Sequence, residues 1–500
     1  MRVVQNPQMQ IGEVDISQIK FDPRSRDDMP KILKGLQHLY TDLALRAQIF
    51  QLLESEISPK VNKRNGRPGM ELWKILVCGV VRLNSNTDYD QLHELVNHHD
   101  TLREMLGHGD YDKFHYPYQT LKDNVSLLTP ELLDKINQLI VHAGHALFKK
   151  KESDALRGRC DSFVVETDVH YPTDINLLYD AMRKVITLTA QWCDRRDVSD
   201  WRQHAYNVKH VKRLMRTAQN RKRSKAKSEQ QQQKNATLIV EAHQEYLNVA
   251  GRYLNKAQET LAMFEQQGYT SEYEVLAKLE IEGFMRHAVR QIDQTKRRVM
   301  LGEVIAHDEK VFSIFEPHTE WISKGKAGVP VELGVKVCIL EDQHRFILHH
   351  QVMEKTTDDQ VTISMVKESK KRFPELNACS FDKGFHTPEN QAALTEQLAL
   401  VALPRKGKLS QQAQASEQSA AFIKARRAHS AVESAINALE VHGLDMCPDH
   451  GIDGFKRYVA LAVVARNIHR IGAILWEQEK KRAQRKRKYD AHDPPCKRAA

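Results

Sequence analysis

The stretch Asp161-Ser162-Phe163-Val164-Val165-Glu166-Thr167 decides how this chain of 500 residues is expected to fold. Phe163, Val164 and Val165 have the β-branched and aromatic character of a buried strand, and the turn sequence Tyr171-Pro172-Thr173-Asp174 ends it. Asp161 lies on this strand or at its start. Helical patterns precede the strand and follow it, so its partners are expected further along the chain.

The other strand patterns lie after residue 305. We predict strands at 311–315, 332–340, 346–352, 378–381 and 400–403, and helices at 359–372 and 388–398. The turn Glu341-Asp342-Gln343-His344 predicts a hairpin between the second and third of these strands. Because strands alternate with helices, the pattern predicts a mixed α/β sheet covered on its faces.

The amino-terminal part, from Asp27 to about Leu147, has the apolar spacing of helices. Gly66–Met70 is expected to form a loop that leads into a helix, and a polar break separates that helix from the next one, Tyr89–Val96. These two helices fit a helix-turn-helix, and Tyr118–Asn124 is a second candidate. An ordinary helical bundle explains the same pattern equally well.

A long, polar helical segment follows the first strand, over residues 186–299. Its basic residues precede a glutamine run at 230–233, and they are Lys209, Lys212, Arg213, Arg216, Arg221, Lys222, Arg223, Lys225 and Lys227. They fit contact with nucleic-acid phosphate and a solvated helix face equally well. The tail 476–500 carries another dense cationic run. It is expected to be disordered and to bind nucleic-acid phosphate.

The composition is that of a globular protein, and its charge favours a polyanionic partner, although a ribosomal or membrane-surface protein would fit the same charge. Of the residues, 41% are hydrophobic and 28% charged, and the formal charge is +10. The seven cysteines lack a CxxC pair or the spacing of a zinc site. Because no apolar signal core or membrane span is evident, we expect a cytoplasmic protein.

Three carboxylates carry the candidate chemistry. Asp161 and Asp382 lie in or beside strand patterns, and Glu433 lies in a helical pattern. Hard oxygen ligands suit Mg²⁺, and two such ions about 3.5 to 4 Å apart promote phosphoryl transfer on nucleic acid. A shifted strand register would make Asp168 the first ligand instead of Asp161.

Most of the chain resembles the DDE transposases of bacterial insertion sequences (ISNCY-like). The matching segments are Asp161–Val165 with Tyr171–Leu178, Ser313–Lys326, Phe381–Phe385, His429–Glu433 and the closing helix Arg457–Ile468. The resemblance favours Asp161 over Asp168. It departs at His429 and Glu440, where many relatives have Arg and Lys, so Arg426, Arg427 and His429 become the candidate phosphate contacts.

The resemblance implies a fold of mixed α and α/β class. A helical DNA-binding region (1–150) would precede an RNase H-like catalytic domain (155–185 and 305–475), interrupted by a basic helical insertion (186–304) and followed by the tail (476–500). It also implies two Mg²⁺ ions, with Mn²⁺ as the alternative ion, held by Asp161, Asp382 and Glu433.

The implied partners are double-stranded DNA, both the inverted repeats at the element ends and the target, and further copies of the chain, at least a dimer. The expected location is the cytoplasm, at the nucleoid. Two other functions share these features. One is a DNA-binding or regulatory protein with an inactive RNase H-like core, and the other is a nuclease that cuts DNA without joining it.

Overall fold

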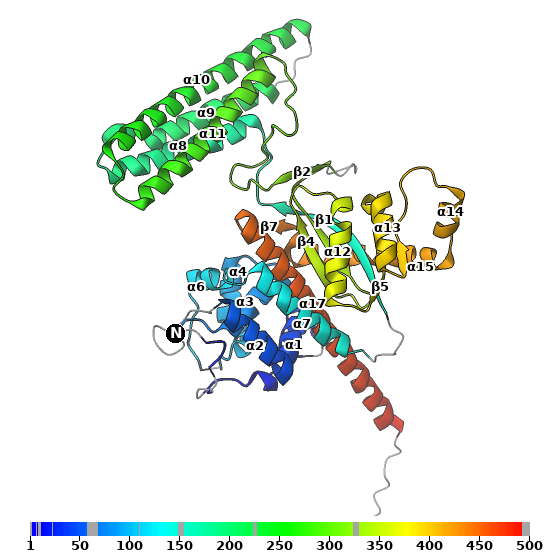
Figure 1. Ribbon diagram of the computed structural model, residues 1–500. Helices are drawn as coiled ribbons and strands as arrows, with labels where there is room; N and C mark the ends of the chain where they lie inside the picture. The colour runs from blue at the N-terminus through cyan, green and yellow to red at the C-terminus, as the bar shows by residue number, and fades with distance from the viewer. Residues whose placement is uncertain are drawn as a thin grey trace, which may run out of the picture. The chain divides into compact units, whose positions relative to one another are not determined.

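The computed structural model describes residues 3–6, 8, 12–22, 24–57, 69–109, 111–148, 155–223, 228–323 and 330–492 (Figure 1). Side-chain surroundings are not described at 222, 223, 412 and 486–492. The expected loop residues Gly66, Arg67 and Pro68, and the basic residues Lys225 and Lys227, lie outside the described residues. The chain forms two compact units: unit 1 is Met1–Asp168 with Ile322–Ala500, and unit 2 is Val169–Trp321.

The first part of unit 1 is helical, as predicted. Its elements are η1 (Ile16–Gln18), α1 (Met29–Thr41), α2 (Leu43–Ile57), α3 (Leu72–Asn84), α4 (Tyr89–His98), α5 (Asp100–Met105), α6 (Tyr118–Val125) and α7 (Pro130–Ala146). Capping side chains fix where α4 and α7 begin, since Asp88 accepts from the Gln91 N–H and Thr129 accepts from the Leu132 N–H. Helix α3 is buried along its whole length, so it is a core helix.

The last part of unit 1 is also helical. Its elements are α14 (Gln411–Glu417), α15 (Ala420–His429), α16 (Ala431–Leu439), the π-helical turn η4 (Glu440–Leu444) and α17 (Gly451–His492). Helix α17 packs against α1, α3 and α7, and also against the sheet. The regions that we predicted as separate, 1–150 and 305–475, therefore share one hydrophobic core.

Unit 1 contains the predicted mixed sheet. Its strands are β1 (Leu156–Thr167), β3 (Val331–Glu341), β4 (Ile347–Met353), β5 (Leu376–Phe381), β6 (Leu400–Ala402) and β7 (Met446–Cys447), while β2 (Glu320–Ser323) spans the boundary between the units. The strand order is β4-β3-β1-β5-β6, with β7 also pairing with β1. Strands β1, β3 and β4 pair antiparallel, whereas β5 is parallel to β1 and β6 is parallel to β5.

The helices between these strands agree with the sequence pattern. Helix α12 (Asp358–Arg372) lies between β4 and β5. The short helix η3 (Lys383–Phe385) and helix α13 (Pro388–Gln397) lie between β5 and β6. The hairpin between β3 and β4 is confirmed, because Asp342 accepts from the N–H groups of His344 and Phe346 at 2.8 and 2.9 Å. The α/β character of this part is therefore as predicted.

Two predictions about secondary structure are wrong. Residues 311–315 form bends and no strand, because the Ser313 hydroxyl accepts from the N–H groups of Phe315 and Glu316 and closes a turn. The tail that we expected to be disordered from residue 476 continues as helix α17 through His492. Residues 493–500 lie outside the described residues.

Unit 2 is a bundle in which α8 (Asp174–Arg195), α9 (His204–Arg223), α10 (Glu229–Gln267) and α11 (Glu272–Met300) run side by side, with η2 (Ser199–Trp201) between the first two (Figure 1). It is larger than the predicted insertion, 186–304. The apolar stripe of α8, including Leu178 and Met182, packs inside the bundle. The first part of the sheet-containing unit therefore ends at Asp168, where we expected residue 185.

Among the described residues, one helical segment, Gly451–Arg485 in α17, is long and apolar enough to cross a membrane. Its apolar window is 78% buried inside the protein. That burial is typical of the core helix of a soluble protein.

Candidate active site

Strand pairing brings the first two predicted carboxylates together. In the parallel pair of β1 and β5, Cys160 is the partner of Phe381. Asp161 and Asp382 directly follow these residues, so they lie level on neighbouring strands, whose backbones are about 5 Å apart, and they share a face of the sheet. Strand β5 ends at Phe381, which leaves Asp382 exposed, while Asp161 is half-buried.

The third predicted carboxylate reaches the same place from a helix. Helix α16 packs against β1 through a face that includes the buried residues Val432 and Ala435. Glu433 lies in the first turn of α16 and is exposed. Its negative charge acts on Asp161, as the pKa of Asp161 shows.

The pKa of Asp161 reports on the whole cluster. Burial raises it to about 6, although the Ser162 N–H, which donates to Asp161 Oδ1 at 2.8 Å, opposes the rise. The negative charges of Asp382, Asp358 and Glu433 raise it further. The three predicted carboxylates therefore lie within electrostatic reach of one another, and we call Asp161, Asp382 and Glu433 the acidic site.

Asp358 is a fourth carboxylate that sequence reasoning missed. It is the first residue of α12, and it accepts from the Ser162 hydroxyl at 2.6 Å. The Lys336 ammonium lies 3.2 Å from its Oδ2. The helix was predicted from residue 359, but acids are common in the first turn of any helix, so the sequence offered no reason to select this one.

His429 lies beside the acidic site. Its Nδ1 is 3.1 Å from the hydroxyl of Ser380, on strand β5. Burial lowers the pKa of His429, while the charges of Asp382 and Glu433 oppose that change. His429 is thus close to the carboxylates, whereas Arg426 and Arg427 are exposed on α15.

Asp168, the alternative first ligand, lies elsewhere. It follows the end of β1 and is exposed. Seven residues of extended chain separate it from Asp161, which corresponds to roughly 23 Å. Asp168 therefore cannot share a metal ion with the neighbours of Asp161.

The acidic site has the oxygen ligands of a magnesium site, but its ligand atoms do not form a close group. In the described part of the chain, the only three His, Cys, Asp or Glu ligand atoms that lie within 4.8 Å of one another belong to Asp28, His442 and His469. Repulsion between like charges opposes the close approach of carboxylates. The oxygen donors and the raised pKa of Asp161 fit a divalent cation such as Mg²⁺.

The two predicted helix-turn-helix candidates differ in their surfaces. Helix α4 exposes Asp90, Gln91 and Glu94, an acidic face that phosphate would not favour. Helix α6 exposes Gln119, Lys122 and Asp123, so its one exposed acid is balanced by a lysine. Of the two, α6 is better suited to a nucleic acid.

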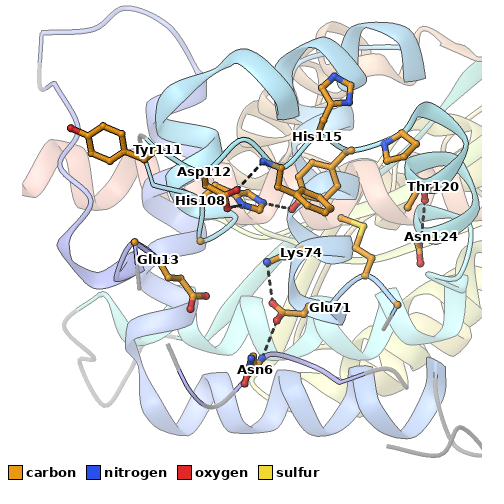
Figure 2. A pocket seen from close by; sticks show the side chains of 17 residues that line it. Asn6, Glu13, Glu71, Lys74, His108, Tyr111, Asp112, His115, Thr120 and Asn124 are labelled. Atoms are coloured by element: carbon orange, nitrogen blue, oxygen red, sulfur yellow. Dashed lines mark hydrogen bonds and ion pairs between the residues drawn. The ribbon is translucent and has the colours of Figure 1, made fainter. Parts of the chain in front are cut away.

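A pocket of about 970 Å³ adjoins α6 and includes Thr120 and Asn124 in its lining (Figure 2). The loop before α6 carries two exposed aromatic side chains, Tyr111 at 97% and Phe114 at 53% exposure. Tyr111 points away from the pocket in Figure 2. The Arg103 guanidinium holds this loop by donating to the Phe114 carbonyl at 3.1 Å.

In unit 2, helix α9 has one apolar and one basic face. Its buried residues include Val211 and Leu214. The exposed basic residues are Lys209, Lys212, Arg213, Arg216 and Arg221. Several of them recur at three- and four-residue spacing, so their charges form a single stripe.

No family model, no curated protein and no solved structure matches this chain in the comparisons. The functional assignment accordingly depends on the geometry and charge of the residues described above.

Proposed function

We propose that this protein is a DDE transposase that binds the terminal inverted repeats of an insertion sequence and catalyses DNA cleavage and strand transfer. One observation carries the proposal. Asp161 and Asp382 lie level on adjacent parallel strands, and the charges of Asp382 and Glu433 both raise the pKa of Asp161. Three acids that are distant in the sequence thus form one electrostatic cluster.

The strand order supports an RNase H-like core. In β4-β3-β1-β5-β6 the first three strands are antiparallel and the last two run parallel to β1, with α12 and α13 in the connections. Asp161 is on the central strand of this order, and Asp382 directly follows the end of its parallel neighbour β5. This arrangement agrees with the fold that the resemblance implies.

Asp161, Asp382 and Glu433 would hold two Mg²⁺ ions, or Mn²⁺. When bound, such ions activate a water or a DNA 3′-hydroxyl and stabilise the leaving oxygen. The chain itself orients the ligands: the Ser162 N–H holds one oxygen of Asp161, and η3 turns the backbone away after Asp382. His429, fixed by the Ser380 hydroxyl, lies where it would contact a phosphate oxygen as a hydrogen-bond donor.

Double-stranded DNA is the proposed partner, and several basic surfaces support it. Helix α6 exposes Lys122, helix α9 carries its basic stripe, and the end of α17 exposes Lys480, Lys481, Arg482 and Arg485. Such side chains bind phosphate with little sequence preference and in a salt-dependent way. A cytoplasmic, nucleoid-associated location and an assembly of at least two copies on DNA belong to the same proposal.

The test is cleavage and joining of labelled DNA taken from the flanks of the coding sequence, with Mg²⁺ present. Asp161→Asn, Asp382→Asn and Glu433→Gln should each lower both activities at least about 100-fold, because loss of even an outer-shell partner costs roughly 10- to 100-fold. Asp168→Asn is the matched control and should keep wild-type activity. Full activity in any of the first three variants would refute the assignment.

A DNA-binding protein with an inactive core is the second candidate, because the exposed basic residues of α6, α9 and α17 could bind DNA without any metal site. Calorimetric titration with Mg²⁺ separates the two. A transposase should bind Mg²⁺ in a way that Asp161→Asn abolishes, whereas an inactive core should show no carboxylate-dependent binding. Cleavage without joining to a target plasmid would instead indicate a nuclease.

A further inference from the structure

A second cluster in unit 1 has a different composition. One ligand atom from each of Asp28, His442 and His469 lies within 4.8 Å of the other two. Asp28 precedes α1, His442 lies in η4 and His469 lies in the middle of α17. Since they come from opposite ends of the chain, folding alone brings them together, and we call them the His–Asp cluster.

The crossing of α1 and α17 explains why Asp28 and His469 meet. At this crossing the two helix backbones touch through glycine. A Cβ added at Gly472 would overlap the carbonyl oxygen of Lys31, and one added at Gly35 would overlap that of Ile468. The absence of these side chains lets the helices approach closely enough to place Asp28 against His469.

A backbone irregularity orients His442. Gly443, next to it, has a φ of +105°, and a Cβ there would lie 2.8 Å from the Tyr458 hydroxyl. His442 is only 8% exposed, and its Nδ1 lies 2.5 Å from the carbonyl oxygen of Asn84. Since a carbonyl can only accept, Nδ1 carries the proton and Nε2 keeps a free lone pair, the arrangement usual in metal-binding histidines.

His469 is a buried imidazole that is ion-paired with Asp28. It is 8% exposed, and neither ring nitrogen makes a hydrogen bond within the described part of the chain. Its Nε2 lies 3.4 Å from Asp28 Oδ1, an ion-pair distance without hydrogen-bond geometry. Its ring centre is 5.4 Å from that of His442. Nδ1 of His469 thus has no hydrogen-bond partner in the described residues, while Nε2 is paired with Asp28, so the side chain is positioned to take part in binding a cation together with that carboxylate.

We propose that Asp28, His442 and His469 bind a divalent transition-metal ion of the zinc class. Two imidazole nitrogens and one carboxylate oxygen suit Zn²⁺, whereas Mg²⁺ prefers oxygen ligands. The fourth position would take water or another small ligand. The ion would tie α1 to α17 and to η4, the turn that directly follows the helix carrying Glu433.

One neighbour competes with the ion. The Lys31 ammonium lies 2.5 Å from Asp28 Oδ1 and occupies part of the carboxylate. The charge of Arg466 also acts on His442. The positive charge of Lys31 opposes a second cation at Asp28, so removal of this lysine should strengthen binding while removal of a ligand weakens it.

The test is a Zn²⁺ titration of the full chain against a chromophoric chelator, in excess Mg²⁺ so that Zn²⁺ does not enter the acidic site. Wild-type protein should bind one Zn²⁺. His469→Gln should bind it at least about tenfold more weakly, since metal sites lose roughly 10- to 100-fold even when an outer partner is removed. His98→Gln, which changes an exposed histidine of α4, is the control and should bind as wild type does.

Further variants keep the proposal testable if His469→Gln fails to fold. Asp28→Asn should weaken Zn²⁺ binding without changing a buried residue, and Lys31→Met should strengthen it. Bound Co²⁺ should give the intense visible bands of a four-coordinate site in wild type but not in Asp28→Asn. Absence of Zn²⁺ binding by wild type, or unchanged affinity in Asp28→Asn, would overturn the proposal.

Discussion

The acidic site and the His–Asp cluster lie in the same unit, yet within the described residues only the second brings three ligand atoms within 4.8 Å of one another. The acidic site consists of carboxylates alone, and the charges of Asp382 and Glu433 raise the pKa of Asp161. Two members of the His–Asp cluster are imidazoles, so less repulsion between like charges opposes their close approach. How closely a set of ligands lies therefore depends on their charge as well as on their function.

The largest expected change in the free energy of unfolding comes from the crossing of α1 and α17, which holds the His–Asp cluster together. Gly472→Ala places a methyl group against the backbone of α1, so the two helices must move apart. We expect a loss of about 3 kcal/mol in the free energy of unfolding, the upper range for overpacking. Urea denaturation measures it, and Zn²⁺ binding should weaken in the same variant.

Gly454→Ala is the matched control in the same helix. A Cβ at Gly454 would make ordinary contacts, the nearest at 3.5 Å. Because alanine favours helix over glycine, this variant should be unchanged or more stable by about 0.5 to 1 kcal/mol. Equal stability of the Gly472→Ala and Gly454→Ala variants would contradict the close helix crossing.

A smaller change in the free energy of unfolding is expected for the acidic site, and there the substitution should stabilise the protein. Asp161→Asn removes a charge that the metal-free fold disfavours, and asparagine can still accept from the Ser162 N–H. At pH 8 the variant should be more stable than wild type by about 2 kcal/mol, from the rise in pKa from 3.8 to about 6 with an allowance for partial exposure. Urea denaturation without divalent cations measures this difference.

The pH dependence follows from the direction of the shift. Between pH 4 and 6 the folded state holds the Asp161 proton while the unfolded state releases it, so wild-type stability falls as pH rises through this range. The advantage of Asp161→Asn should accordingly vanish below about pH 4. Added Mg²⁺ should stabilise wild type and not the variant. A variant that is less stable than wild type at pH 8 would contradict the electrostatic account.

The smallest effect concerns the carboxylate that the sequence did not reveal. Asp358→Asn removes one of the charges that raise the pKa of Asp161, so that pKa should fall slightly. The measurement is the pH midpoint at which the stability advantage of Asp161→Asn appears, compared in backgrounds with and without Asp358→Asn. An unchanged midpoint would show that the Lys336 ammonium already neutralises Asp358.

Local patterns predicted much of the fold correctly. The β3–β4 hairpin, helix α12 and the strand bearing Asp161 follow from residue periodicity and turn residues, which act over a few positions. Predictions failed where a side chain or a distant partner overrides periodicity. The Ser313 hydroxyl converts an apolar run into a turn, and helix α17 continues through the expected tail.

The sequence by itself determined where the candidate acids lie: Asp161 on a strand, Asp382 just after the end of a strand, and Glu433 on a helix. Only the tertiary structure decided which of them meet, because register and helix crossing arise from contacts between distant segments. The pairing of Cys160 with Phe381 brings Asp161 level with Asp382. The glycine contacts between α1 and α17 bring Asp28 to His469, a proximity that no spacing in the sequence indicates.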